Sequence, residues 1–459
     1  MLLKLLPFEI KQQVKQTGFW AATLALIWMA VLITSQRGSA MLFANSAYAI
    51  TQTLLFIAPN IIFVICVLAS ATVLRDSEYK MEPLIFTTPI DKFKYLASRY
   101  LSIAAAGCLI LLIALVAMMI TPYFLSPEML GPYHLSFYLV NYLIFIVPSV
   151  LLCTSFVFAA AMLSKSMITV FVSGIVLYAI YIIGSILGNS PLMAGSSVLS
   201  EGYGFASLIE PYGLIAYMEQ SAYWSAEQRN TFLPSLTGEL LLNRILWLAI
   251  SFSLFVFTYK MFTFRTVNES KAKKLKEAQP SKQGVSSPSP VPYSSVKPMI
   301  SFSDFNLSVM LSKFNIEYTT AAKGKVFIVL MITTVALTLG NVVSSIFEGP
   351  IANGQSYLPQ TALILELLQE PLAKIGMLVV IFFTVELFWH ERTVNISHLV
   401  DCTPTQNATF YLAKLCTVLA IGFTMITVSA VTAILFQLTQ GEFNIQPQLY
   451  LLLYYYSGL

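Results

Sequence analysis

Long apolar stretches recur along this chain and constrain its fold more than any other feature of the sequence. A helix that crosses a bilayer needs about 20 predominantly apolar residues, because the hydrocarbon core is roughly 30 Å thick. Stretches that fit this requirement lie at 18–35, 53–74, 99–121, 137–163, 166–187, 240–263, 325–346, 371–389 and 412–437, and another begins near 449. Only 10% of the residues are charged, whereas soluble domains carry roughly a quarter. The sequence therefore predicts an all-α integral membrane protein.

Lysine and arginine are concentrated in alternate connections between these stretches. They precede the first span, surround the connection after the second span, and follow the fourth and sixth spans. The intervening loops, 36–52, 122–136 and 188–239, carry only Arg37 and Arg229 clear of the span ends. Because cytoplasmic loops of membrane proteins are enriched in these residues, we expect a multi-pass protein of the cell's inner (plasma) membrane with a cytoplasmic N-terminus.

The first residues, MLLKLLPFEIKQQVKQTGFW, form a distinct element. Lysines interrupt its apolar positions and no cleavage site of small residues follows, so it does not fit a signal peptide. It predicts an amphipathic helix that lies in the headgroup region and leads into the first span.

Two polar segments of similar layout separate apolar spans in the two halves of the chain. RDSEYKMEPLIFTTPIDKFKYLASRYL occupies 75–101, and HERTVNISHLVDCTPTQNATFYLAKLC occupies 390–416. One offset of 315 residues relates Asp76 to Glu391, Thr88 to Thr403, Pro89 to Pro404, and Arg99 to Lys414. The flanking spans match in length and order, which indicates a tandem duplication of one membrane module. An even number of spans per module predicts parallel repeats.

This duplication divides the chain into three parts. Residues 1–263 form the first six-span module, and 264–304 form a Ser-, Pro- and Lys-rich linker without hydrophobic periodicity, expected to be a flexible cytoplasmic tether. Residues 305–459 form the second module, which we expect to be incomplete, with about three and a half spans, because position 459 corresponds to Ile144 in the fourth span. Eleven residues from Leu449 would rise only about 16 Å. The chain is thus expected to be a piece of a longer protein.

The repeated polar segment has the features of a short surface helix. Pro83 and Pro89 stiffen the first copy, and the charged residues of that copy, Glu78 among them, lie toward its start. Thr88 and Thr403 each precede a proline, an order that suits a helix start. We expect a short helix parallel to the membrane followed by a turn into the next span; the alternative is a solvated loop with a capped turn.

These blocks together resemble the permease half of type-2 ABC exporters (ABC-2-type permeases). LLPFEIKQQVKQTGFW is similar to the amphipathic connecting helix of that family, and 75–101 is similar to its coupling helix between spans two and three. HLVDCTPTQNATFYLAK is the matching core in the second copy, and 188–239 resembles the re-entrant region between spans five and six. The resemblance covers the first 263 residues and continues through 305–459.

The resemblance implies a function and a partner. Two modules would form the transmembrane unit of an exporter, and a separate ABC ATP-binding subunit would dock on the two coupling segments. ATP would act only through that partner, because the chain contains no GxxxxGK[ST] phosphate-binding loop. The other expected partners are membrane lipids and a transported lipid, peptide or drug-like substrate; no nucleic acid is expected. The coupling residues implied are Asp76, Glu78, Pro83, Thr88, Pro89, Arg99, Glu391, Thr403, Pro404 and Lys414.

Other polar residues are candidates for a metal, catalytic or intramembrane site. His390-Glu391 does not continue as HExxH, since position 394 is Val, and no catalytic, cofactor or metal residues are predicted. Asn60 and Glu386 lie within apolar spans, where polar residues are functional candidates. Asn60 is expected to hydrogen-bond across helices or line a substrate path, and Glu386 to pair with His390 or reach the interface. No disulfide is expected among the five cysteines.

Two further functions remain open from the sequence. Proteins of this permease type also occur fused to a zinc aminopeptidase domain, so the chain could be the membrane portion of such a fusion. It could instead be a membrane anchor that transports nothing.

Overall fold

The computed structural model describes residues 2–37, 41–124, 129–188, 203–264, 307–347, 361–393, 400, 402, 406–441 and 443–451. These residues are mostly helical and include no strand. Eight helices among them are long and apolar enough to cross a membrane. The prediction of an all-α membrane protein is confirmed.

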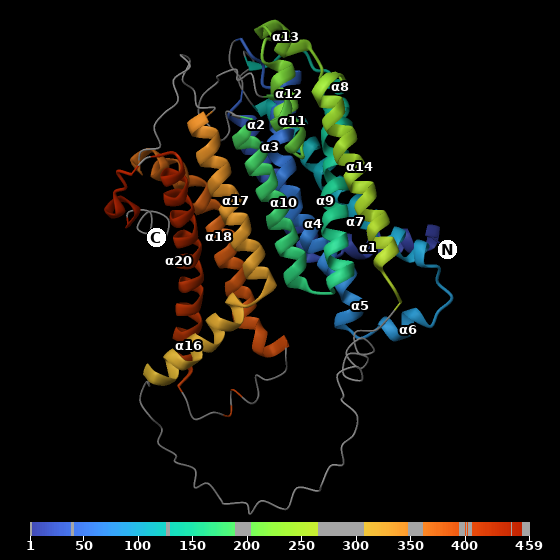
Figure 1. Cartoon of the computed structure of the whole chain (residues 1–459). Helices are drawn as coiled ribbons and strands as arrows, with labels where there is room; N and C mark the ends of the chain where they lie inside the picture. Colours follow the sequence, from blue (N-terminus) through green and yellow to red (C-terminus); the bar gives the residue numbers. More distant parts are fainter. Residues whose placement is uncertain are drawn as a thin grey trace, which may run out of the picture.

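The first half of the chain contains the helices expected for six spans (Figure 1). An amphipathic helix, α1, precedes them at Leu2–Val14. The first, third, fifth and sixth spans are α2 (Thr17–Ser35), α7 (Lys92–Ile120, extended by the 3₁₀ turn η3, Thr121–Phe124), α10 (Met167–Leu187) and α14 (Gly238–Met261). The fourth is built from α8 (Leu135–Asn141), the π-helical segment η5 (Tyr142–Ile146) and α9 (Val147–Ser164).

The second span is a continuous run of helical segments from Ala47 to Glu78. It joins α3 (Ala47–Ile57), the 3₁₀ turn η1 (Ala58–Asn60), α4 (Ile61–Ala69), the π-helical segment η2 (Ser70–Leu74) and α5 (Arg75–Glu78). It begins several residues before the apolar stretch predicted from 53, because the Ser46 hydroxyl accepts a hydrogen bond from the Ala49 amide and caps the helix there. Hydropathy detects the apolar part of a helix and not its capped end.

Close helix contacts position the centre of this module. α9 packs against α4, α7, α10 and α14. A Cβ atom at Gly107 would lie 2.8 Å from Ile65 Cδ1, and one at Gly174 would lie 2.6 Å from the Cys66 sulfur. Small residues at such positions let helix backbones approach, which is how helices associate in a lipid environment.

Three short helices connect the fifth and sixth spans in the described residues. They are α11 (Tyr203–Ile209), α12 (Leu214–Ser221) and α13 (Ala226–Thr231), and they lie at the end of the bundle opposite α5 and α6 (Figure 1). The turn between α11 and α12 is buried, with Glu210 and Tyr212 both 0% exposed. This turn is therefore enclosed by protein, and re-entry of the region into the bilayer stays a prediction.

The described part of the second half contains four longer helices. α16 (Leu307–Ala322) is followed by α17 (Lys325–Phe347), α18 (Thr361–Thr393) and α20 (Asn407–Thr439). α16 packs on α20 as α1 packs on α7, and α17 packs on α20 as α2 packs on α7. The two halves meet where α10 packs against α17 (Figure 1).

Several predicted features fall outside the described residues. They include most of the linker expected at 264–304, Thr403, Pro404, and the part of the last predicted span beyond 451. The described start of that span is helical from 447 to 451.

Candidate functional site

A buried ion pair fixes the start of the first polar segment. Asp76, in α5, and Arg99, in α7, are 4% and 3% exposed, and Arg99 Nη2 lies 2.5 Å from Asp76 Oδ2. Arg99 Nη1 also donates to the Thr72 carbonyl at 2.6 Å, and the Tyr95 hydroxyl donates to Asp76 Oδ2 at 3.1 Å. Both charges are therefore satisfied, as a buried pair requires. The pair joins the end of the second span to the start of the third.

The amphipathic helix α1 is attached to the same place. Arg75 Nη2 lies 3.3 Å from Glu9 Oε1. Gln13, which is 1% exposed, donates from Nε2 to Thr72 Oγ1 at 3.0 Å and to Ser102 Oγ at 3.1 Å. The polar face of α1 thus contacts both the second and the third span, and α1 cannot shift without disturbing them.

The second half carries an equivalent pair at the positions related by the 315-residue offset. Glu391, at the end of α18, lies 3.1 Å from Lys414 Nζ in α20. Glu391 also accepts from Lys313 of α16 at 2.9 Å, and Lys313 pairs in turn with Glu317 at 3.2 Å. Lys414 is 6% exposed. The same end of the bundle therefore has an acid–base contact linking the amphipathic helix and two spans in each half.

Helix α6 (Glu82–Phe86) lies across the end of the first half and is held from two sides. The Lys165 ammonium, in the tight turn between α9 and α10, lies 2.8 Å from the Glu82 carboxylate. The Phe86 ring packs edge-on against Tyr95 and Phe262 and in a tilted orientation against Phe264. A displacement of α6 would therefore act on the third, fourth, fifth and sixth spans.

The outer face of this segment is exposed and partly apolar. Tyr79 is 73% exposed, Leu84 63% and Phe93 50%. Glu78, Pro83, Thr88 and Pro89 of the predicted coupling set are exposed as well. Asp76 and Arg99, in contrast, are buried, so they support the segment from inside and do not form its surface.

Thr88 does not cap a helix that begins at Pro89, which its position before that proline had predicted. Its hydroxyl donates to the Ile85 carbonyl at 2.6 Å, and Thr87 donates to Leu84 at 2.9 Å. Helix α7 begins only at Lys92, after Asp91. The two threonines satisfy carbonyls at the end of α6, and the non-helical residues 89–91 separate them from the next helix.

Sequence reasoning missed a buried polar clamp at the turn between α11 and α12. The Glu210 carboxylate accepts from the Tyr212 and Leu214 amides at 2.7 and 2.5 Å. Arg244 Nη2 donates to the Pro211 carbonyl at 3.1 Å, and Asn243 Nδ2 donates to the Glu210 carbonyl at 2.7 Å. The adjacent Asn243 and Arg244 inside the apolar run LLLNRILWLAI were the available signal, since polar residues in a span need partners.

The predicted intramembrane residues have local roles. Asn60 is half-buried and donates to the Phe56 carbonyl of its own helix at 3.0 Å, not across helices as one reading expected. Glu386 lines a cavity that also contains Glu317 and Glu391. The side chain of His390 lies outside the described residues.

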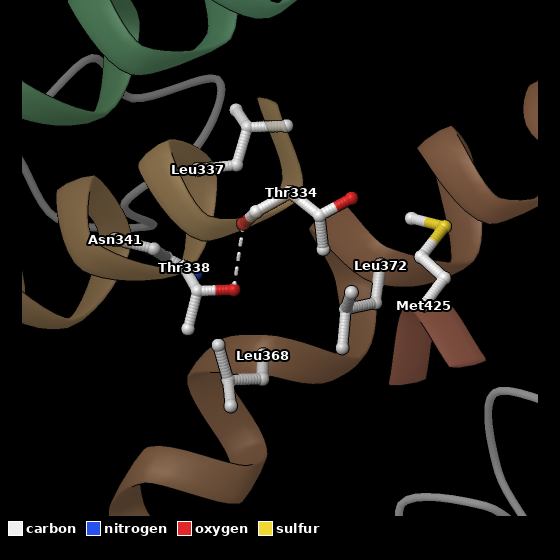
Figure 2. A pocket seen from close by; sticks show the side chains of 7 residues that line it. All are labelled: Thr334, Leu337, Thr338, Asn341, Leu368, Leu372 and Met425. Atoms are coloured by element: carbon white, nitrogen blue, oxygen red, sulfur yellow. Dashed lines mark hydrogen bonds between the residues drawn. The ribbon is translucent and has the colours of Figure 1, made fainter. Parts of the chain in front are cut away.

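A small cavity lies between α17, α18 and α20 in the second half (Figure 2). Its volume is about 10 Å³, close to the space needed for one water molecule. Thr338 donates to the Thr334 carbonyl at 2.9 Å and shares a hydrogen bond with Ser429 at 2.8 Å. The cavity is too small to hold a transported molecule.

The described residues contain no group of three or more His, Cys, Asp or Glu side chains that could hold a metal ion. All five cysteines are free thiols.

The long apolar helices define a multi-pass membrane protein, and a short helix, α6, is held against four of its spans at one end. Residues 17–225 match the family model described as ABC-2 family transporter protein. The match runs from the start of α2 to the residue before α13 and covers somewhat less than half of the chain. No curated protein and no solved structure matches the chain.

Proposed function

We propose that this chain is a membrane component of an ABC-type transporter, which the family match over residues 17–225 supports. We propose that it is the permease of an ATP-driven exporter and that a separate ATP-binding subunit docks on the exposed face of α6. The observation that carries this proposal is the attachment of α6. Its inner side is fixed by Glu82–Lys165 and by the Phe86 ring cluster, while Leu84 on its outer side is exposed.

Such an attachment suits a mechanical role. A partner that pushed α6 would move the α9–α10 turn through the Glu82–Lys165 ion pair. α10 packs against α17 of the second half, so the displacement would reach the contact between the two halves. A simple solvated loop would need neither the ion pair nor the aromatic cluster.

We further propose that the second half is a parallel copy of the first and presents a second docking segment between α18 and α20. The pair Glu391–Lys414 stands where Asp76–Arg99 stands in the first half, which supports this. In the proposed topology, the α6 end faces the cytoplasm, as the lysine and arginine distribution indicates. Lipids, peptides and drug-like compounds all remain candidate substrates.

Two experiments test these proposals. In a variant with all native cysteines replaced, Leu84→Cys should react with a membrane-impermeant maleimide from the cytoplasmic side only. Labelling from the opposite side alone would overturn the proposed topology. A second test of the topology is a reporter fused at Ser225, which should be active only outside the cytoplasm.

The partner is tested by co-expression with an ATP-binding subunit encoded beside this chain. Leu84→Asp places a charge on the docking face and should abolish stimulation of that subunit's ATPase activity. Phe124→Asp is the matched control, because Phe124 is 84% exposed at the opposite end of α7. Equal stimulation by both variants would exclude α6 as the docking site.

A further inference from the structure

A cavity of about 370 Å³ lies beside α13, at the end of the bundle opposite α5 and α6 (Figure 1). Three segments of the first half line it: residues 41–46, which we call the strap, residues 131–137, and α13 itself. Ser46 lines the cavity and is 2% exposed. A volume of this size holds on the order of ten water molecules.

The strap is attached firmly to the segment that leads into α8. The Asn45 side-chain amide donates to the Gly131 carbonyl and accepts from the Gly131 amide, both at 2.8 Å. The Ala44 amide donates to the Met129 carbonyl at 2.9 Å. The Phe43 ring lies against Gly131, where an added Cβ atom would be 2.5 Å from Phe43 Cδ2. This side of the cavity therefore combines three hydrogen bonds with ring packing.

The attachment of α13 on the other side of the cavity is weaker. The Asn230 side-chain amide accepts from the Phe43 amide at 3.0 Å and donates to the Met41 carbonyl at 2.9 Å. The Arg229 guanidinium carbon lies 5.0 Å from the centroid of the Tyr48 ring in α3. None of the six residues of α13 is buried. Side-chain contacts near the surface, and not burial, thus hold α13 against the strap and α3.

The segment that carries α13 has a closed base. Gln220 and Ser235 flank it, 15 residues apart in the sequence. The Gln220 side-chain amide donates to the Ser235 carbonyl at 2.9 Å and accepts from the Ser235 amide at 3.1 Å. Surface loops whose ends are held together in this way are compact units. Residues 221–234 can therefore move as one body while their ends stay in place.

We propose that residues 221–234 form a lid that opens away from the strap and uncovers the cavity, with Asn230 as its latch. Opening exchanges two neutral hydrogen bonds for bonds to water, and the net contribution of such bonds is modest. The Gln220–Ser235 base stays closed. In the proposed exporter the lid lies on the side where the substrate leaves. That role rests on the proposed function, whereas the movement of the lid does not.

The test measures, in detergent, how fast a cysteine in the cavity reacts with a maleimide on a polyethylene glycol chain too bulky to enter while the lid is closed. Ser46→Cys supplies the thiol in a variant without native cysteines. Adding Asn230→Ala should speed the reaction roughly tenfold, because two hydrogen bonds that hold the lid closed are lost. Asn230→Asp keeps the acceptor for the Phe43 amide but repels the Met41 carbonyl, so its rate should be intermediate.

Glu227→Gln is the matched control, because Glu227 lies on α13 and lines the same cavity. It should leave the rate unchanged. An unchanged rate in Asn230→Ala, or an equal increase in Glu227→Gln, would overturn the proposal.

A variant that keeps only Cys153, which is 0% exposed, separates lid opening from unfolding. Cys153 should stay unreactive when Asn230→Ala is added; if it reacts, the milder Asn230→Asp decides by the same two readouts. The assay contains no ATP-binding subunit and no membrane, so the lid and the proposed function can fail independently. In the complex with that subunit, ATP should change the Ser46→Cys rate; an unchanged rate there would overturn the role in export alone.

Discussion

Arg99 and Lys414 lie 315 residues apart in the sequence and each pairs with a carboxylate, but the two carboxylates differ in how many other cations contact them. Asp76 receives its shortest ionic contact from Arg99, at 2.5 Å, and Arg75 Nε is farther away at 3.7 Å. Glu391 has two lysine partners at comparable distances, Lys414 at 3.1 Å and Lys313 at 2.9 Å. Removing one member of a buried pair leaves an uncompensated charge in the protein interior. This charge determines how much the free energy of unfolding falls.

Arg99→Met should therefore destabilise the protein by about 3–5 kcal/mol, the range for a broken buried pair. Lys414→Met should cost distinctly less, because Lys313 still contacts Glu391. The measurement is the free energy of unfolding in mixed detergent micelles, with Lys94→Met, at an exposed lysine of α7, as the control. Equal losses in the two variants would show that Lys313 does not support Glu391.

At the scale of single elements, the short helices depend on a few polar contacts, because they bury little surface of their own. The α11–α12 turn needs a left-handed residue at Gly213, with φ +82°, and Arg244 fills the space beside it. Helix α6 has five residues, too few to be stable alone. Both elements are placed by side chains from distant spans.

Gly213→Ala should cost about 3 kcal/mol, because the left-handed backbone disfavours a Cβ atom and Arg244 must also give up hydrogen bonds. A Cβ at this position would lie 2.6 Å from Arg244 Nη2. Gly441→Ala is the matched control: its φ is +80° with nothing within 4 Å, so only the backbone cost of about 1 kcal/mol should appear. Thermal unfolding midpoints of the two variants should differ accordingly, and equal midpoints would contradict the role of Arg244.

The Glu82–Lys165 ion pair should hold α6 against the α9–α10 turn. Glu82→Gln is expected to speed amide hydrogen exchange in residues 82–88 about fivefold, equivalent to about 1 kcal/mol for a partly exposed pair. The exchanged-charge variant, Glu82→Lys with Lys165→Glu, should restore slow exchange. An unchanged amide exchange rate in Glu82→Gln would mean that the Phe86 ring cluster, and not the ion pair, holds α6 in place.

At the scale of the whole molecule, the contact between α10 and α17 joins the two halves. A Cβ atom at Gly340 would lie 4.0 Å from the Ile183 Cβ, within the usual Cβ–Cβ range for a disulfide of about 3.5–4.5 Å. Ile183→Cys with Gly340→Cys, in a variant without native cysteines, should therefore oxidise readily.

A protease site inserted in the segment 265–306 makes this crosslink visible. After cleavage, the two halves should remain one band on a non-reducing gel and separate when reduced. Ile183→Cys with Leu339→Cys is the control, since Leu339 is 37% exposed and its side chain should not reach Ile183. Separation of the halves in both variants would mean that α10 and α17 do not pack as described.

The class of the protein and most of its spans could be predicted from the sequence, because a bilayer demands long apolar helices whatever their neighbours are. Periodicity also placed α1, and the repeated polar segments identified Asp76, Arg99, Glu391 and Lys414 as related positions. These are local or self-similar signals, readable without knowing which helices touch.

Only the tertiary structure decided what those residues contact. Asp76 and Arg99 were predicted from a polar segment yet lie inside, because the second and third spans converge there. The partners Glu82 and Lys165 are 83 residues apart, and Glu210 lies 33 residues from Asn243. Hydropathy carries no information on such pairings, since burying a charge depends on a partner that packing brings from elsewhere in the chain.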